Sequence, residues 1–283
     1  MIDGHIRNEI RRRLTPLLGE REARAVTMLL FEQIGGLSAV DVLTGRDEEL
    51  PDETKEKLLS AARRVELGEP VQYVTGKVVF LGMELEVNPA VLIPRPETEE
   101  LVRLIIRENS GLNHVNVLDI GTGSGCIALA VKKQMADARV EAWDVSENAL
   151  DVARRNAEKN TLNVDFQQHD ILQPQHTAER FDIIVSNPPY ICISEAAEME
   201  RHVIDYEPHT ALFVPDDDPL RFYRFIARFA CQHLNTGGKI YFETNRAYAA
   251  DVAELIKTNG FIETEVINDQ FGNQRIVRGK VGQ

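Results

Sequence analysis

The sequence has few cysteines and no long apolar run, and each absence excludes a class of protein. Its 283 residues include three cysteines, Cys126, Cys192 and Cys231, and no two of them form a C-x-x-C pair. This pattern argues against a disulfide scaffold and a structural zinc cluster, and favours reduced thiols in the cytoplasm. No segment approaches the ~20 apolar residues of a membrane span, and the first residues lack the apolar core of a signal peptide.

Positive charge is also scarce. The chain has 32 Lys and Arg against 45 Asp and Glu, a formal net charge of −13. Because binding to phosphates needs a local surplus of cations, we expect no direct contact with nucleic acid. None of the seven histidines lies at metal-ligand spacing from another ligand, so we expect no metal ion either. The 43% of apolar residues is ordinary for a globular chain with real cores.

The character of the chain changes twice along its length. Residues before 70 place apolar side chains such as Ile6 and Ile10 at helical spacing, which predicts a small helical bundle. From Val71 to Val91 the β-branched and aromatic residues, separated by glycines, predict a β-hairpin. Strands and helices then alternate, which predicts an α/β fold, a doubly wound parallel sheet with helices on both faces. We place an N-terminal helical domain at 1–72, a hairpin linker at 73–92 and the α/β domain at 93–283.

A glycine-rich turn follows the first strand of the α/β domain. The segment 119–125 reads Asp-Ile-Gly-Thr-Gly-Ser-Gly and joins a strand expected over 115–120 to a helix expected over 124–134. Its glycines let the backbone turn sharply and let a ligand approach, next to the free N–H groups of a helix start. The spacing differs from the G-x-G-x-x-G of dinucleotide-binding folds. The alternative is a tight turn without a ligand. We assign to a cofactor site Gly121, Thr122, Gly123, Ser124 and Gly125.

Two aspartates end the next two strands. Asp144 ends the strand 139–144, where an acid can accept both ribose hydroxyls of a nucleoside ligand. The alternative for Asp144 is a cap on the helix that starts near Ser146. NAD and S-adenosyl-L-methionine both carry such a ribose, so these features leave both cofactors open. Asp170, which follows the strand 164–169, is a candidate acceptor for an adenine amino group or, equally, a cap of its own loop.

The segment Asn187-Pro-Pro-Tyr190 decides between these two cofactors. It follows the strand 181–186 and so lies at the carboxyl edge of the sheet, where open α/β sheets bind ligands. Two prolines remove two N–H donors and stiffen the backbone. The Asn187 side-chain oxygen and the Pro188 carbonyl can therefore accept both hydrogens of a planar –NH2 group. This favours methyl transfer to an amide or an exocyclic amine over hydride transfer, although a rigid turn is the alternative.

We therefore assign catalytic roles to Asn187, Pro188 and Tyr190, and substrate binding to all four residues, Pro189 included. Asn187 also belongs to the cofactor site in this interpretation. Tyr190 is expected to pack against the substrate or the cofactor. The nitrogen of a substrate amide is a poor nucleophile, because its lone pair is delocalised into the carbonyl. The two oxygen acceptors would orient this nitrogen in line with the methyl group, so most of the rate should come from positioning and electrostatics.

These motifs resemble those of a known family. Asn187–Tyr190 and the 119–125 loop look like those of class I S-adenosylmethionine-dependent methyltransferases that act on planar amino groups. Gly68–Gly76, Val91–Glu99 and Tyr206–Pro208 resemble the protein-(glutamine-N5) methyltransferases that modify peptide chain release factors. The resemblance implies a helical N-terminal domain that helps to dock the release factor, a hairpin linker and a seven-stranded catalytic domain. The implied target is the glutamine of the Gly-Gly-Gln motif in class I release factors.

We predict a monomeric, cytoplasmic enzyme that uses S-adenosyl-L-methionine and does not bind membranes. Two alternatives stay open. An N6-adenine or N2-guanine nucleic-acid methyltransferase could use the same acceptors, but it would need a basic target-binding domain. A non-catalytic S-adenosylmethionine-binding scaffold would not need Asn187. The chain departs from the family pattern at Ile171, where some relatives have an aromatic residue, and at Glu243-Thr-Asn-Arg246, which lacks the usual glycine and glutamine.

Overall fold

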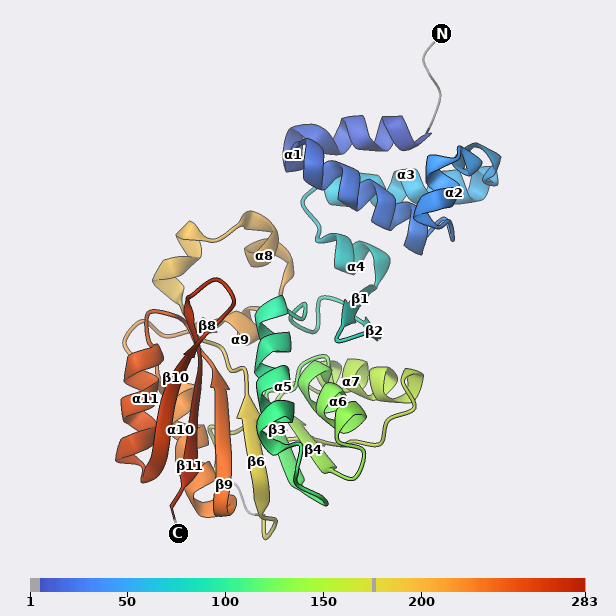
Figure 1. The fold of residues 1–283 in the computed structure, drawn as a ribbon. Helices are drawn as coiled ribbons and strands as arrows, with labels where there is room; N and C mark the ends of the chain where they lie inside the picture. Colours follow the sequence, from blue (N-terminus) through green and yellow to red (C-terminus); the bar gives the residue numbers. More distant parts are fainter. Residues whose placement is uncertain (1–5, 175–176, 283) are drawn as a thin grey trace. The chain divides into compact units, whose positions relative to one another are not determined.

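The computed structural model describes residues 6–174 and 177–282 (Figure 1). The chain divides into two compact units. The first comprises Met1–Lys77 together with Glu200–Tyr206, and the second comprises Val78–Met199 together with Glu207–Gln283. The domain boundaries predicted from the sequence, which did not include a return of the chain at 200–206, stay predictions.

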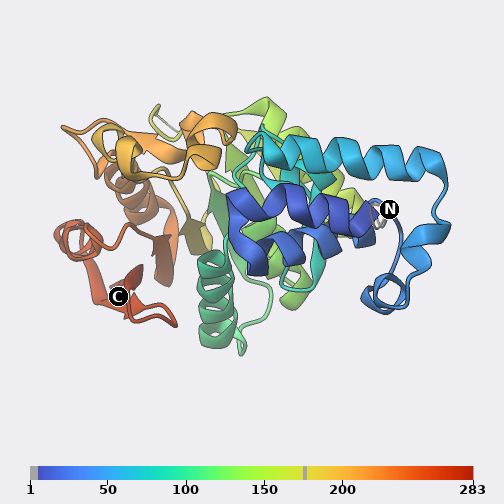
Figure 2. The ribbon, with the colours of Figure 1, turned by 90° about the horizontal axis from the view of Figure 1, so that it is seen from above.

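Helices build the first unit, as the apolar periodicity predicted. Helix α1 (Ile6–Gln33) is interrupted at Gly19, whose φ of 75° only glycine adopts without strain. Its two arms fold back beside each other (Figures 1 and 2). The other helical segments are α2 (Ala39–Leu43), the 3₁₀ turn η1 (Arg46–Glu49), α3 (Asp52–Glu66), α4 (Val71–Thr75) and α8 (Arg201–Tyr206). The arms of α1 and helix α3 share one apolar core.

Helix α4 corrects one prediction, because the β-rich residues from Val71 onward were expected to begin the hairpin. The Pro70 carbonyl accepts the N–H groups of Tyr73 and Val74, at 2.9 and 3.0 Å, and Gly76 ends the turn with a φ of 75°. Val74 is buried in the core of the N-terminal helices. Burial of this side chain against α1 and α3 outweighs the β-propensity of the residues, which is strongly context-dependent.

The predicted hairpin is present further along the chain, as β1 (Lys77–Phe80) and β2 (Met83–Glu86). A buried asparagine attaches β2 to the rest of the second unit. Asn156 Oδ1 accepts the Glu86 N–H at 2.5 Å, and Nδ2 donates to the carbonyls of Glu86 and Ser124, both at 3.0 Å. One side chain therefore connects the hairpin, helix α7 (Glu147–Lys159) and the glycine-rich turn.

A seven-stranded sheet forms the centre of the second unit, in the order β10-β11-β9-β6-β3-β4-β5. Neighbouring strands are parallel, except that β11 pairs antiparallel with both β9 and β10. This confirms the predicted doubly wound sheet, which ends in an antiparallel pair. The strands are β3 (Asn116–Ile120), β4 (Arg139–Asp144), β5 (Asp165–Gln168), β6 (Phe181–Ser186), β9 (Leu234–Glu243), β10 (Phe261–Asn268) and β11 (Gln274–Val281).

Helices cover both faces of this sheet (Figure 1). One core contains α5 (Pro96–Asn109), α6 (Cys126–Gln134) and α7 (Glu147–Lys159), and the other contains α10 (Arg221–His233) and α11 (Ala249–Thr258). Short segments lie between β6 and α10, namely β7 (Ile191–Cys192), η2 (Ile193–Glu198), α9 (His209–Leu212) and β8 (Phe213–Val214). Strand β3 has β4 on one side and β6 on the other, so the order of connection reverses there and leaves a crevice for a ligand.

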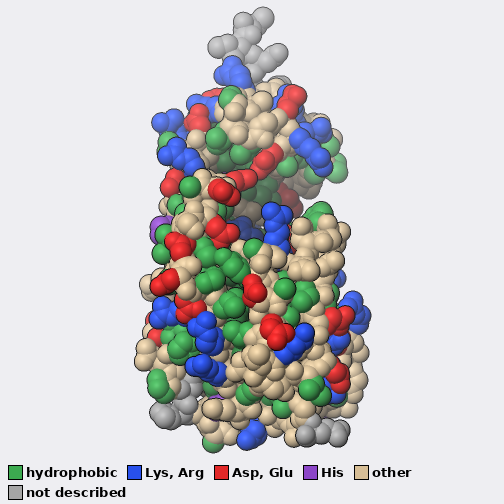
Figure 3. Space-filling model, turned by 90° about the vertical axis from the view of Figure 1, so that its left-hand side faces the viewer, with side chains coloured by type: hydrophobic (Ala, Val, Ile, Leu, Met, Phe, Trp, Pro, Cys, Tyr) green, Lys and Arg blue, Asp and Glu red, His purple; other side chains and the backbone are tan. Residues whose placement is uncertain are grey.

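The part of the chain that the structure describes contains neither a membrane-spanning helix nor a metal-binding cluster. None of its helices is long and apolar enough to cross a membrane. No group of three or more His, Cys, Asp or Glu side chains there is arranged to hold a metal ion. On the face of the molecule in Figure 3, cationic and anionic side chains are interspersed.

Candidate active site

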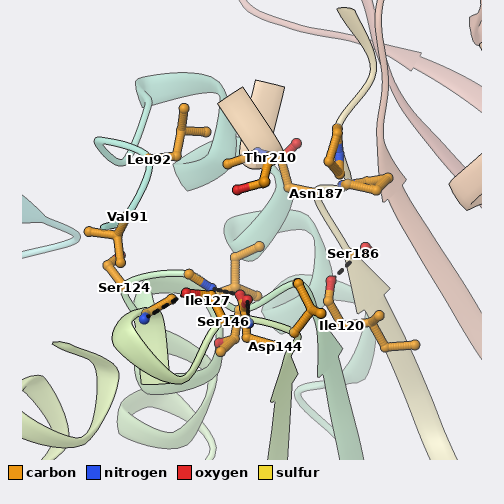
Figure 4. Close-up of a pocket in the computed structure, with 18 of the residues that line it drawn as sticks. Val91, Leu92, Ile120, Ser124, Ile127, Asp144, Ser146, Ser186, Asn187 and Thr210 are labelled. Atoms are coloured by element: carbon orange, nitrogen blue, oxygen red, sulfur yellow. Dashed lines mark hydrogen bonds between the residues drawn. The ribbon is translucent and has the colours of Figure 1, made fainter. Parts of the chain in front are cut away.

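A cavity of about 140 Å³ (the volume open to the centre of a water molecule) lies at the carboxyl ends of the central strands. All its lining residues belong to the second unit. In Figure 4, Asp144 and Ser146 lie on one side of this cavity, and Asn187 and Thr210 lie across from them. The lining contains most of the predicted site, namely Gly121, Thr122, Gly123, Ser124, Asp144, Asp170, Asn187, Pro188 and Pro189. Gly125 and Tyr190 are not part of it.

The three glycines of the turn serve two different purposes. All three have positive φ, 76° at Gly121, 55° at Gly123 and 80° at Gly125. A Cβ added at Gly121 or Gly123 would meet no atom within 4 Å, so the backbone there borders open space. A Cβ at Gly125 would lie 3.2 Å from Ala153 Cβ, so this glycine permits close packing of the turn on α7. The first two positions therefore suit a ligand, and the third suits the fold.

Asp119, at the end of β3, supports the turn from beneath. Its Oδ2 accepts the Thr122 hydroxyl at 2.6 Å and the Ala128 N–H, in the first turn of α6, at 3.2 Å. The residue is fully buried, and burial raises the pKa of its carboxyl to about 7. The sequence motif contains Asp119, but the predicted site did not include it. In the structure its contacts lie in the turn and not in the cavity.

Asp144 presents a carboxylate to the cavity from the end of β4. Its Oδ2 accepts the Gly123 N–H at 2.8 Å, and its Oδ1 accepts the Ser146 N–H at 2.9 Å. Burial raises the pKa of Asp144, against the lowering effect of these backbone donors. Ser146, and not Asp144, caps α7 by accepting the Ala149 N–H. A carboxylate offers about four acceptor positions, so Asp144 keeps capacity for a further donor beyond these backbone N–H groups.

Asp170 lines the cavity and also stabilises its own loop. Its Oδ1 accepts the Leu172 N–H at 3.0 Å, so the capping alternative is present in the structure. The predicted contact with an adenine stays a prediction. Next to it, Ile171 is 9% exposed and adds an apolar wall to the cavity. His169, also in the lining, stacks on Trp143 with ring centroids 4.2 Å apart.

The segment Asn187–Pro189 lies at the edge of the cavity, as its place after β6 predicted. The preceding Ser186 hydroxyl donates to the Ile120 carbonyl at 2.6 Å, which fixes the end of β6 against β3 (Figure 4). The Asn187 side chain donates through Nδ2 to Thr98 Oγ1 at 3.4 Å. With this hydrogen bond the Asn187 Nδ2 faces α5. The Asn187 Oδ1, on the other side of the same amide, remains as a hydrogen-bond acceptor.

Tyr190 lies outside the cavity lining. It packs as a partly buried side chain against the core that contains Tyr223 and Ile226. Burial raises the pKa of the Tyr190 phenol, so this hydroxyl stays protonated at neutral pH. The expected contact of Tyr190 with substrate or cofactor stays a prediction.

Sequence reasoning assigned no role to several residues that border the cavity. Arg95 lines it, and Nη2 of Arg95 donates to the buried Glu207 at 2.5 Å; the other oxygen of Glu207 accepts the Ile93 N–H at 3.2 Å. Thr98 and Thr210 also belong to the lining. Both segments that pair here, Val91–Glu99 and Tyr206–Pro208, were noted for their family resemblance. A single sequence contains no signal that brings them together.

The fold and the site define a class of protein. Residues 98–204 match the family model described as "Methyltransferase small domain", and residues 6–76 match the "PrmC N-terminal domain". A solved methyltransferase from Pyrococcus furiosus has the same fold, with a TM-score of 0.54 and 22% identity, over 79% of this chain and 99% of that one. The chain has the fold of a class I methyltransferase, and part of it matches a methyltransferase family model.

Comparison with curated proteins narrows this class to one family. The chain is 45% identical to the release factor glutamine methyltransferase of Bacteroides thetaiotaomicron, over 95% of this chain and 96% of the relative. It is 38% identical to the enzyme of the same name from Flavobacterium psychrophilum, over 98% and 99%. The chain belongs to the release factor glutamine methyltransferase family.

Proposed function

We propose that this chain transfers the methyl group of S-adenosyl-L-methionine to the side-chain amide nitrogen of the glutamine in the Gly-Gly-Gln motif of class I peptide chain release factors. One observation carries the proposal: Asn187 stands at the edge of the cavity with its amide nitrogen bonded to Thr98. Its oxygen is thereby left to accept a hydrogen of the substrate, next to the Pro188 carbonyl. The names of the two relatives support the choice of substrate.

The residues of the cavity fit the cofactor. Open space beside Gly121 and Gly123 leaves room for a ligand to contact the backbone closely. Asp144 has an acceptor oxygen for each of two ribose hydroxyls, and Ile171 offers an apolar surface to the adenine. When bound, S-adenosyl-L-methionine supplies a methyl group on a positively charged sulfur. These observations support the assignment of the cofactor site to the turn and to the ends of β4 and β5.

The Asn187 side-chain oxygen and the Pro188 carbonyl oxygen would help an amide nitrogen, which is a weak nucleophile, to react. They hold both hydrogens of the glutamine –NH2 group, which fixes the nitrogen in line with the methyl carbon and stabilises positive charge that develops on it. The nitrogen lone pair forms the new C–N bond, and the electron pair of the broken C–S bond stays on sulfur. One N–H proton then leaves to solvent. Asn187 and Pro188 would act in this way as acceptors only, without a strong base.

The helical first unit would help to bind the protein substrate. It matches the PrmC N-terminal domain, and we expect it to contact the release factor outside the glutamine motif. The chain is expected to act as a cytoplasmic monomer.

Methyl transfer to defined substrates tests the proposal. The purified chain is incubated with labelled S-adenosyl-L-methionine and a class I release factor, the same factor with alanine in place of the motif glutamine, duplex DNA, or RNA. We expect label in the release factor, none in its alanine variant, and none in either nucleic acid. Label in DNA or RNA alone would support the nucleic-acid alternative, and cofactor binding without any transfer would support the scaffold alternative.

A further inference from the structure

A short relay of hydrogen bonds runs behind Asn187. Glu243 Oε2 accepts the Thr98 hydroxyl at 2.7 Å, and Thr98 Oγ1 accepts the Asn187 amide N–H at 3.4 Å. We propose that Thr98 and Glu243 are positioning residues that fix which way the Asn187 amide faces. The inference rests on the proposed function, because the orientation matters only if the Asn187 oxygen accepts a hydrogen of the substrate amide.

The fold brings these three residues together from distant parts of the chain. Thr98 lies in the first turn of α5 and is 2% exposed. Ser186 is paired with Phe242 in the parallel β6–β9 ladder, so Asn187 and Glu243 follow at the ends of neighbouring strands. Glu243 is 1% exposed. The contact between Asn187 and Thr98 is long for a hydrogen bond, and hydrogen bonds in active sites often tighten when the substrate binds.

The direction of the relay follows from the chemistry of its members. An ionised carboxylate only accepts hydrogen bonds, so Thr98 must donate to Glu243. The Thr98 oxygen can then only accept from Asn187, which must offer Nδ2. A flipped amide would place two acceptor oxygens against each other at Thr98. It would also present an –NH2 group to the –NH2 group of the substrate, where neither side could accept.

The charge on Glu243 therefore controls the direction of the relay. Burial raises the pKa of Glu243 to about 7, against the lowering effect of the Thr98 hydrogen bond and the Arg275 guanidinium. When protonated, Glu243 can donate to Thr98, and the hydroxyl can then donate to a flipped Asn187. The other titratable groups that face this carboxyl come from several elements, namely Glu97, Arg95, Cys126, Tyr190 and Tyr223.

Paired substitutions at Thr98 test the relay. Thr98→Val removes the hydroxyl but keeps the shape, and Thr98→Ser keeps the hydroxyl. We expect Thr98→Val to lower kcat on the release factor by roughly tenfold, the usual effect of one lost hydrogen bond, with no change in the cofactor dissociation constant. Thr98→Ser should restore most of kcat. The control is Thr258→Val, which removes a hydroxyl that donates to the Leu255 carbonyl at the end of α11, outside the cavity lining; its kcat should equal that of the wild type.

Three results would overturn the inference. They are full activity in Thr98→Val, an equal loss of kcat in Thr98→Ser, or a loss that appears in cofactor binding and not in kcat. An active wild type with any of these results would leave the proposed function intact and remove the relay alone. A wild type that methylates no release factor would overturn the proposed function itself, and the relay with it.

The pH dependence of kcat gives a readout that a merely structural role would not change. For the wild type, kcat should rise as pH increases through about 7, because ionised Glu243 holds Asn187 in the productive orientation. Glu243→Gln cannot ionise, so this rise should disappear from its profile. A wild-type profile without the rise, or the same rise in the variant, would contradict the role of Glu243.

Discussion

The two oxygens of Asp144 already accept backbone hydrogen bonds and keep capacity for a further donor. If this carboxylate binds the ribose, Asp144→Ala should weaken the binding of S-adenosyl-L-methionine by about 1–3 kcal/mol, as expected for losing hydrogen bonds to a charged group. Calorimetric titration of the cofactor measures this change. Asp151→Ala, an exposed acid on α7, is the matched control and should not change the affinity. Equal affinities of Asp144→Ala and wild type would contradict the ribose assignment.

Two buried acids make the stability of the chain depend on pH. Burial raises the pKa of both Asp119 and Glu243 to about 7. For an acid whose pKa is higher when folded, the folded state binds more protons, so stability falls as pH rises from the ordinary pKa to the folded one. Between pH 4 and 8 the loss should be up to roughly 3 kcal/mol from Glu243 and up to roughly 4 kcal/mol from Asp119.

Urea denaturation at pH 5 and pH 8 checks this prediction for Glu243. The free energy of unfolding should fall less between these two pH values in Glu243→Gln than in the wild type, because the variant has lost one of the two titrating groups. Asp119 remains in the variant, so part of the dependence should persist. An identical fall in both proteins would mean that the Glu243 carboxyl titrates normally.

At the scale of elements, the glycine-rich turn separates binding from folding. Gly123→Ala adds a methyl group in open space, and Gly125→Ala adds one 3.2 Å from Ala153 Cβ and 3.3 Å from Leu129 Cδ1. Both substitutions carry the strain of a positive φ, about 1 kcal/mol. We expect Gly123→Ala mainly to lower cofactor affinity, and Gly125→Ala to lower the free energy of unfolding by clearly more than Gly123→Ala does. Calorimetry and urea denaturation compare them; a reversed order would contradict the division of roles.

The elements that the sequence predicted best are those with a local signal. Alternating apolar strands and amphipathic helices predicted the succession of strands and helices along the α/β domain, and glycine positions located its turns. Helix α4 was missed because contacts with α1 and α3 determine it. Strand β9 begins at Leu234, directly after helix α10. The first part of this strand is irregular, because Gly237 has a φ of 78° and the pairing with β6 shifts register opposite it.

At the scale of the whole molecule, the candidate site was predictable where its residues are contiguous. Residues 121–124 of the turn and the segment 187–189 belong to short motifs, and both border the cavity. The pairs that support them were not predictable, because their members are far apart in the chain. Arg95 pairs with Glu207, and Thr98 with Glu243, across 112 and 145 positions. Only folding brings such residues together, and one sequence without relatives does not reveal which pairs will meet.

The net negative charge of the chain is only weak evidence about its substrate. The net charge of −13 was an argument against nucleic acid as the substrate. The relatives, which are similar over nearly the whole chain, carry the name of a methyltransferase of protein glutamine. Net charge therefore agrees with the family but does not by itself select the release factor, because charge affects association and solubility and not the fold.

The central claim is that the oxygens of Asn187 and Pro188 hold the substrate amide for methyl transfer. It is tested most directly by kcat for methylation of a class I release factor, measured for wild type, Asn187→Ala and the exposed control Asn113→Ala. Removal of a preorganised acceptor at the reacting group should lower kcat about 100-fold or more in Asn187→Ala. The cofactor dissociation constant should stay unchanged, and Asn113→Ala should behave as wild type. Full activity in Asn187→Ala would contradict the account.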